Sequence, residues 1–276
     1  MVTGCSSGIG HCAARGLRER GYRVFATARR EADLRRLSEE GLETVMMDLA
    51  DSGSIVRAAE EVLERTGGNV YALFNNAAYG QPGAVEDLSR AALREQFETN
   101  LFGTHELTCR IIPAMRARGE GRIIQNSSIL GLVAMPYRGA YNASKFALEG
   151  LSDTLRQELA GTGIHVVLIE PGPILSRFRA NALAAFRRHV APSVGFHAEI
   201  YQAMLQRLAS EGAVAPFTLP PEAVLRPLVK ALESRRPGTR YPVTVPAVTF
   251  SWLRRFLPTR WLDRILASES RRASRP

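Results

Sequence analysis

Close to the start of the chain the sequence reads Thr3-Gly4-Cys5-Ser6-Ser7-Gly8-Ile9-Gly10. Glycine permits a tight turn and lets backbone N–H groups approach a phosphate, and the positive end of a following helix favours that negative charge. A glycine pattern alone is a weak signal, but here alternating strand-like and helix-like segments follow at once. The stretch therefore predicts a dinucleotide-binding turn at the head of an α/β domain.

Apolar runs of strand length alternate along the chain with longer segments of helical periodicity, which favours parallel βαβ units with right-handed crossovers. The expected strands are 22–27, 43–48, 70–75, 121–127, 165–170 and 241–245. The expected helices are 11–20, 54–65, 90–118 and 142–160. We therefore expect one Rossmann-like domain over residues 1–276, a doubly wound parallel sheet with helices on both faces.

Two segments depart from this pattern. Residues 177–221 form an insertion after the 1–176 core, where apolar side chains alternate with basic ones, and we expect a helical lid over a substrate site. Its apolar residues are Phe178, Leu183, Phe186, Phe196, Tyr201, Met204 and Leu208. A basic tail occupies 250–276, with seven arginines against two acidic residues from 254 onward.

The composition narrows the classes of partner and compartment. The net charge is +9, but only Lys145 and Lys230 of the 36 basic residues are lysine and the arginines are spread along the chain, which favours a solvated surface over a nucleic-acid site. Neither a signal peptide nor an apolar run of the ~20 residues needed to cross a bilayer is visible. Three cysteines without metal-ligand spacing are expected to be free thiols, so we expect a cytoplasmic protein without a metal.

The cofactor preference is indicated by the end of the second strand of such a fold, Ala26-Thr27-Ala28-Arg29-Arg30. A carboxylate there would bind a ribose hydroxyl and select NAD, but none is present. The guanidinium of Arg29 or Arg30 can grip a 2′-phosphate, so NADP(H) is preferred and NAD(H) is the alternative. Both arginines could equally be ordinary surface residues.

Further cofactor contacts are expected where the next strands end. Asp48-Leu49 is suited to the adenine amino group, although Asp48 could equally cap the helix that begins near Ser52. In Asn75-Asn76-Ala77-Ala78, small residues allow the backbone to pass close to the cofactor, and an Asn amide can tie adjacent strands together.

Tyr141 and Lys145 lie four positions apart in an expected helix, and therefore on one face of it. A tyrosine with a pKa near ~10 is a poor base at neutral pH, and a neighbouring ammonium favours its phenolate. Ser128, at the end of an expected strand, can meet the phenol and hydrogen-bond a substrate oxygen. Asn100, in an expected helix, could hold a water that relays protons to Lys145. Each residue has an ordinary explanation singly; together they predict a proton-transfer site.

These motifs, in this order, resemble the short-chain dehydrogenase/reductase family over roughly residues 2–176. The resemblance implies that Tyr141 donates and accepts the proton, Lys145 activates it, Ser128 orients the substrate and Asn100 holds a water. It also implies that the segment Pro171-Gly172-Pro173-Ile174-Leu175-Ser176 surrounds the nicotinamide. The residues expected at the cofactor are Gly4, Ser6, Ser7, Gly8, Ile9, Gly10, Arg29, Asp48, Leu49, Asn76, Tyr141, Lys145, Pro171, Gly172, Ile174 and Ser176.

Three positions depart from the family's pattern. Ser176 stands where a threonine is usual, and Ala78 where glycine is commoner. Only Met1 and Val2 precede Thr3, so the first strand, normally central in the sheet, is expected to be nearly absent. Either the start of the sequence is truncated, the reading we favour, or cofactor binding is weakened.

The substrate class is suggested by similarity to the branch that contains hydroxysteroid and retinol dehydrogenases. It implies an apolar secondary alcohol or ketone, or a long-chain aldehyde, and Met135-Pro136-Tyr137 would line an apolar pocket beside the lid. A non-catalytic NADP-binding sensor or scaffold of the same fold is the alternative. The family also implies a homo-oligomer, a dimer or tetramer formed through the long helices.

The tail carries a further expectation, because apolar residues recur in it at helical spacing beside arginines. These residues are Trp252, Leu253, Phe256, Leu257, Trp261, Leu262, Ile265 and Leu266. Packing against the domain or a second subunit explains them, and a peripheral contact with an anionic membrane is the second hypothesis.

Overall fold

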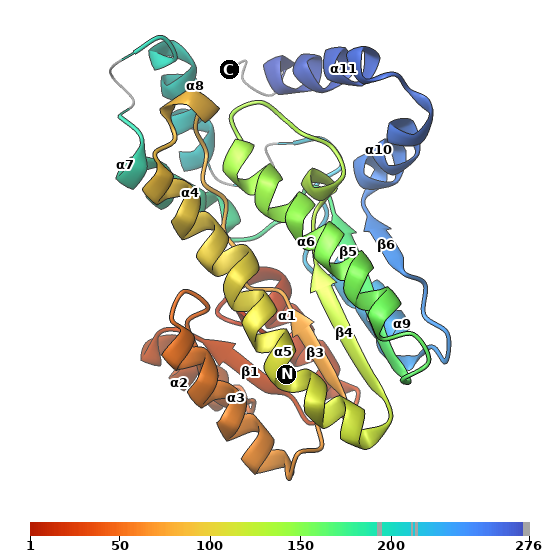
Figure 1. Cartoon of the computed structure of the whole chain (residues 1–276). Helices are drawn as coiled ribbons and strands as arrows, with labels where there is room; N and C mark the ends of the chain where they lie inside the picture. Colours follow the sequence, from red (N-terminus) through yellow and green to blue (C-terminus); the bar gives the residue numbers. More distant parts are fainter. Residues whose placement is uncertain (192–194, 211, 213–214, 273–276) are drawn as a thin grey trace.

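The computed structural model describes residues 1–191, 195–210, 212 and 215–272 of the chain. Its centre is a parallel sheet in which the six expected strands are present (Figure 1). They are β1 (Phe25–Ala28), β2 (Glu43–Met46), β3 (Ala72–Asn75), β4 (Gly121–Asn126), β5 (Ile164–Pro171) and β6 (Arg240–Val243). The last strand ends two residues earlier than expected, because Thr244 caps the next helix and its hydroxyl accepts a hydrogen bond from the Ala247 N–H.

Residues 1–3 lie between β1 and β3 and occupy the centre of the sheet. The Val2 N–H donates to the Phe25 carbonyl at 2.9 Å, and the Thr3 N–H donates to the Phe74 carbonyl at 3.0 Å. Val2 thereby forms parallel bridges on both sides, so the strand order is β2, β1, residues 1–3, β3, β4, β5, β6. The first strand is nearly absent, as expected, but the one bridged residue, Val2, pairs with the strands on both of its edges.

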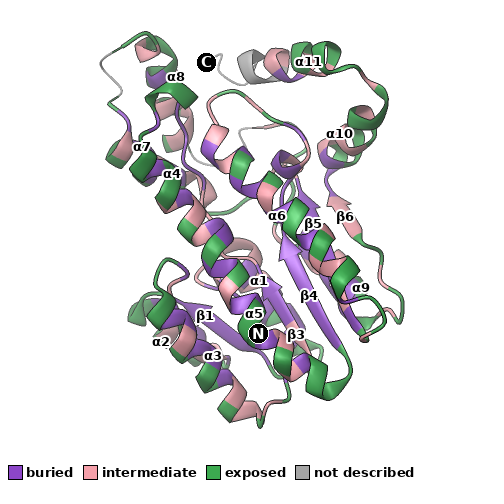
Figure 2. Ribbon diagram, viewed as in Figure 1, coloured by how far each residue is buried: buried purple, intermediate pink, exposed green. Residues whose placement is uncertain are grey.

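Helices cover both faces of the sheet, as expected for a doubly wound fold. One face carries α1 (Gly8–Glu19), α2 (Glu31–Glu39) and α9 (Glu222–Glu233); the other carries α3 (Ser52–Thr66), α5 (Gly103–Arg118) and α6 (Gly139–Glu158). Figure 2 shows β1, β3, β4 and β5 largely buried, the edge strand β6 of intermediate exposure, and the outward faces of these helices exposed. An apolar core lies on each face of the sheet. Because the strands are parallel, their carboxyl ends lie at one common edge.

The expected helix over 90–118 is one rod with an irregular centre. It consists of α4 (Arg90–Phe97), the π-helical turn η2 (Glu98–Phe102) and α5. It begins at Ser89, whose hydroxyl accepts from the Ala92 N–H at 3.1 Å, and it ends at Gly119, which adopts a φ of +74°. The wide turn places Asn100 on the inner side of the rod, where its side chain is buried.

The insertion after β5 is helical, with α7 (Phe178–His189) and α8 (Ala198–Ala209). Phe186 and Tyr201 form a separate small core with Ala84 and Leu88, which flank the 3-10 turn η1 (Val85–Asp87). The Ala84 N–H donates to the Tyr201 hydroxyl at 3.0 Å. Residues 192–194, 211 and 213–214 of this segment lie outside the described residues. These helices stand beside the carboxyl ends of the strands (Figure 1).

The tail folds into α10 (Val245–Phe256) and α11 (Thr259–Arg272), on the other side of the same sheet edge (Figure 1). Ala247 and Leu266 are buried, whereas Trp252, Phe256 and Trp261 are exposed. Among the described helices, none is long and apolar enough to cross a bilayer. The three cysteines are unpaired thiols, as expected.

Candidate active site

A cavity of about 900 Å³ opens at the carboxyl ends of the strands, between α7 and α8 on one side and α10 and α11 on the other. Parallel α/β sheets bind ligands at this edge, where the strand order reverses. Of the residues predicted from the sequence, only Gly10 and Asn100 are not among those that line it. The glycine turn and the Tyr141 side chain therefore belong to one continuous site.

The glycine turn fits a dinucleotide phosphate because side chains are excluded from it. Gly4 has a φ of +70° and Gly8 a φ of +57°, conformations that favour glycine. A Cβ on Gly10 would lie 2.3 Å from the Gly4 carbonyl oxygen and 2.5 Å from the Asn76 amide nitrogen. The start of α1 thus leaves an open backbone cradle at a helix N-terminus, where an anion is favoured.

Asn76 holds this cradle against the neighbouring strands. Its amide nitrogen donates to the Thr3 carbonyl at 2.9 Å, and its oxygen accepts from the Asn126 amide at 2.9 Å. The Thr3 hydroxyl in turn accepts from the backbone N–H groups of Asn76 and Ala77. The expectation that an Asn amide ties adjacent strands together is confirmed.

The adenosine end of the site is marked by the residues that follow β1 and β2. Arg29 lines the cavity and its exposed guanidinium has no partner among the described residues, whereas Arg30 is bound to Asp33 at 2.8 Å. Asp48 also lines the cavity and accepts from the Ala50 N–H. The hypothesis that Asp48 caps α3 is wrong, because Asp51 performs that role by accepting from the Gly53 N–H at 2.9 Å.

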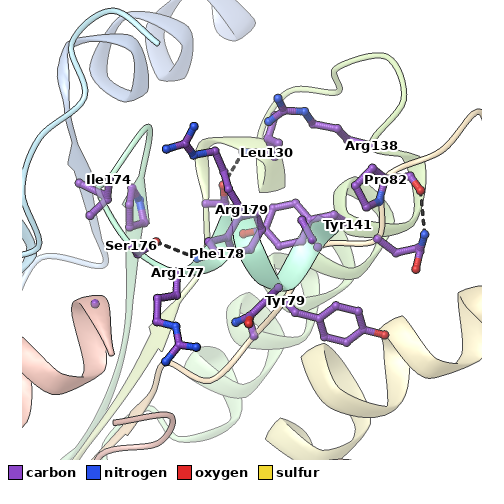
Figure 3. Close-up of a pocket in the computed structure, with 18 of the residues that line it drawn as sticks. Tyr79, Pro82, Leu130, Arg138, Tyr141, Ile174, Ser176, Arg177, Phe178 and Arg179 are labelled. Carbon is purple, nitrogen blue, oxygen red and sulfur yellow. Dashed lines mark hydrogen bonds between the residues drawn. The ribbon is translucent and has the colours of Figure 1, made fainter. Parts of the chain in front are cut away.

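The segment 171–176 follows β5 and closes the site over the glycine turn. A Cβ on Gly8 would lie 2.8 Å from the Ser176 Cβ, and Ile174 pairs with Leu219. Gly172 approaches Thr244 so closely that a Cβ would lie 2.2 Å from its hydroxyl. This contact explains why the chain needs glycine after Pro171. The segment lines the cavity together with the glycine turn and Tyr141 (Figure 3).

Tyr141 is partly buried in the cavity wall, where its ring meets Phe178 edge to face with the centroids 5.2 Å apart (Figure 3). Burial raises the pKa of the phenol to about 12. A hydrogen bond with Ser128 and the positive charge of Arg138 favour the phenolate and oppose this rise. The Ser128 hydroxyl also accepts from the Leu130 N–H at 3.1 Å and caps the turn η3 (Ile129–Gly131). The expected meeting of serine and phenol is therefore present.

Lys145 lies one turn beyond Tyr141 on α6, and its ammonium donates to the Asn126 carbonyl at 2.7 Å. Burial lowers its pKa to about 8, opposed by the negative charge of Glu149. Its nitrogen is 5.8 Å from the centre of the Tyr141 ring. In this structure the charge that favours the phenolate comes from Arg138 and not, as expected, from Lys145, because the ammonium turns toward the end of β4.

Known proteins share this arrangement. The family model described as short chain dehydrogenase matches residues 1–185. The chain belongs to the short-chain dehydrogenase family. It is 43% identical over 267 residues to the uncharacterized oxidoreductase YbbO of Escherichia coli (strain K12), covering 96% of this chain and 93% of the relative.

Two further comparisons place this short-chain dehydrogenase within its family. It is 34% identical over 257 residues to human 17-beta-hydroxysteroid dehydrogenase type 1, covering 88% of this chain and 76% of the relative. A short-chain dehydrogenase structure from Streptomyces avermitilis superposes with a TM-score of 0.74 at 30% identity, covering 98% of this chain and 93% of that one. The resemblance read from the motifs is confirmed, and the protein is an oxidoreductase with a nicotinamide-cofactor fold.

Asn100 supports the dehydrogenase site from behind the cavity. Its amide nitrogen donates to the Tyr79 carbonyl at 2.9 Å and to the Ser144 hydroxyl at 3.2 Å, and its oxygen accepts from the Tyr79 N–H at 3.1 Å. The side chain thus fixes the loop after β3 to helix α6, which carries Tyr141 and Lys145. With both of its N–H donors engaged there, it is a positioning residue in this structure, and a water-holding role stays a prediction.

The sequence also missed residues that shape the cavity. Tyr79, Arg138, Arg179 and Arg207 line it, yet none lies in a motif, and four different segments supply them. Among the expected lid residues, Phe178, Met204 and Leu208 do line the cavity, as do the three residues 135–137. Phe186 and Tyr201 instead build the separate core described above. Helical spacing could not distinguish these two groups.

Proposed function

We propose that this dehydrogenase interconverts an apolar alcohol and its ketone or aldehyde, with Tyr141 giving or taking the proton. The observation that carries the proposal is the position of the partly buried Tyr141, whose hydroxyl lies beside Ser128 and in the same cavity as the glycine cradle. When bound, the nicotinamide supplies or accepts the hydride. Ser128 orients the substrate oxygen, and Arg138 adds positive charge that favours proton loss from the phenol. The Lys145 ammonium lies one helical turn away, 5.8 Å from the centre of the ring.

NADP(H) is the proposed cofactor, with NAD(H) as the alternative. The Arg29 guanidinium, which has no hydrogen bond or ion pair with the described residues, stands at the end of β1, where a ribose 2′-phosphate would lie. No carboxylate directly follows Ala28 to repel that phosphate. Arg30 is already neutralised by Asp33, which leaves Arg29 as the phosphate contact.

An apolar substrate chain is supported by the far wall of the cavity. Met204 and Leu208 of α8 face the site together with Phe250 of α10 and Leu266 of α11. Such a wall removes hydrocarbon from water, which contributes about 25 cal/mol per Å² of apolar surface buried.

The test measures the oxidation of NADPH, from the loss of its absorbance, in the presence of a panel of apolar ketones and aldehydes. The native enzyme and Tyr141→Phe are compared. We expect native turnover and a loss of about 10²- to 10⁴-fold in kcat for the variant, with NADPH binding retained. NADPH binding without turnover of any substrate would instead support the sensor or scaffold alternative.

The exposed side chains of the tail support a contact with an anionic membrane surface. Trp252 and Phe256 stack with their ring centroids 6.3 Å apart, and Arg255 and Arg264 lie over the tail's tryptophan rings. Aromatic groups with flanking arginines suit such an interface. In liposome co-sedimentation, Trp252→Ser with Phe256→Ser should lower recovery on anionic vesicles; equal recovery would favour packing against a second subunit.

A homo-oligomer is proposed through α6, which leaves Phe146 and Leu151 exposed. Two such apolar side chains on one long helix suit a helix-to-helix contact between copies. Light scattering on the native protein and on Leu151→Glu checks this, since the substitution should shift the mass toward the monomer.

A further inference from the structure

Three arginines converge on the substrate side of the cavity. Arg138 directly precedes α6, Arg179 lies in the first turn of α7, and Arg207 lies near the end of α8. In Figure 3 the Arg138 and Arg179 side chains both extend above the Tyr141 ring. Three segments that are distant in the sequence therefore bring positive charge to the place where a substrate must lie.

No carboxylate neutralises the nearest of these groups. The Arg138 guanidinium has neither a hydrogen bond nor an ion pair with the described residues. Arg179 donates to the carbonyls of Arg207 and Gly212 and to the Ser210 hydroxyl, all of them uncharged acceptors. Burial, together with the charge of Arg207, lowers the pKa of Arg138 to about 10.

Arg240, another partly buried arginine, provides a contrast. The partly buried Arg240 lies 3.0 Å from Glu149, 2.7 Å from Asp153 and 3.0 Å from Glu170. The charges of Arg138 and Arg179, which have no carboxylate partner among the described residues, are unfavourable for the folded state in a low-dielectric site. Their presence in the cavity is explained if a ligand supplies the negative charge.

The acidic residues of the cavity cannot serve as that partner. Among the described lining residues only Asp48 and Glu95 carry a carboxylate. Asp48 lies at the adenosine end, and Glu95 is held by Arg188 at 2.9 Å and by His189 at 2.7 Å. The wall on the substrate side is thus cationic beside Tyr141 and apolar farther out.

We propose that the substrate is an amphipathic anion, an apolar chain with a carboxylate, phosphate or sulfonate group that Arg138 and Arg179 bind while Tyr141 meets the reacting oxygen. The inference rests on the proposed function, since it names the substrate class of the same site. In the reducing direction the carbonyl carbon receives the hydride and its oxygen receives the phenolic proton, giving the alcohol and the oxidised cofactor. The anionic group is not altered.

The test compares the reduction of oxoalkanoic acids with that of their methyl esters, matched in chain length and in the position of the carbonyl. We expect kcat/KM to favour the acid by about 10- to 100-fold, the value of one or two charge-assisted hydrogen bonds. Arg138→Gln and Arg179→Gln should each lower this preference about tenfold. Arg187→Gln, an exposed position on α7 outside the cavity lining, is the matched control and should retain it.

A binding measurement separates this inference from the proposed reaction. Dodecanoate should raise the melting temperature of the native protein more than dodecanol does, and dodecyl phosphate shows whether a phosphate is preferred to a carboxylate. Arg179→Gln should abolish the difference between acid and alcohol, and Arg187→Gln should keep it. Stabilisation by the acid without any turnover would overturn the proposed reaction alone. Equal or better use of the esters, with no extra stabilisation by the acid, would overturn the anion site alone.

Discussion

The Glu149 carboxylate lies one turn beyond Lys145 on α6, and its negative charge opposes the fall in the pKa of the buried ammonium. Glu149 is itself held by Arg240 at 3.0 Å. The charge state of Lys145 therefore depends on a residue that lies outside the cavity lining.

Replacing this carboxylate tests that dependence. In Glu149→Gln the pKa of Lys145 should fall further below 8, so the ammonium is lost at a lower pH. The alkaline limb of the kcat/KM profile should move down by about one pH unit. Glu158→Gln, exposed on the same helix, should leave the profile in place; the same shift in both variants would contradict the assignment.

The glycine cradle predicts a contrast between two alanine substitutions. Gly10→Ala places a Cβ 2.3 Å from the Gly4 carbonyl and should reduce NADPH affinity by at least about tenfold, together with stability. Gly150→Ala, in the exposed middle of α6, meets no atom within 4 Å and should stabilise the protein by about 0.5–1 kcal/mol. Fluorescence titration and urea unfolding measure both, and normal NADPH affinity in the Gly10 variant would refute the cradle.

Replacing Arg29 should weaken the binding of a cofactor that carries a 2′-phosphate and leave the binding of NADH nearly unchanged. Arg29→Ser should raise the Kd for NADPH about 10- to 100-fold, since a hydrogen bond between charged groups contributes about 1.5–3 kcal/mol. The Kd for NADH should stay within about twofold of the native value, because NADH has no 2′-phosphate for Arg29 to bind. Arg35→Ser, exposed on α2, is the control. Parallel losses for both cofactors would argue against a phosphate contact.

Glu170 predicts a pH-dependent stability. Its side chain is 1% exposed, and burial, followed by the charge of Glu149, raises its pKa to about 7. The folded state therefore retains a proton that the unfolded state loses near pH ~4.5. The contribution of Glu170 to the free energy of unfolding falls as the pH rises from ~4.5 to about 7. Relative to the native protein, Glu170→Gln should gain on the order of 2 kcal/mol between about pH 5 and about pH 8 in urea unfolding. A constant difference would contradict the raised pKa.

Much of the fold was predictable because its signals are local. Strand-length apolar runs, the glycine turn and the spacing of Tyr141 and Lys145 each depend on residues close in the sequence. The very short central segment was not predictable, since its stability comes from hydrogen bonds that Val2 and Thr3 make with Phe25 and Phe74. Only the neighbouring strands reveal that it pairs on both sides.

The candidate site was predictable in its members but less so in its electrostatics. Helical spacing placed Lys145 beside Tyr141, but it could not show that the ammonium turns to the Asn126 carbonyl. A π-helical turn has the same local composition as an α-helix, so the inward position of Asn100 was hidden as well. The convergence of Arg138, Arg179 and Arg207 depends on tertiary packing alone.

Helix α8 is fastened to the body of the protein at several points. Tyr201 bonds to Ala84 and Asp87, and His197 lies 2.6 Å from Glu86 and 3.3 Å from the Tyr137 hydroxyl. The conformational entropy of this wall is therefore lost when the chain folds and not when a substrate arrives. Substrates should thus be discriminated by their fit to a formed surface, and association should be limited by encounter more than by reorganisation of α8.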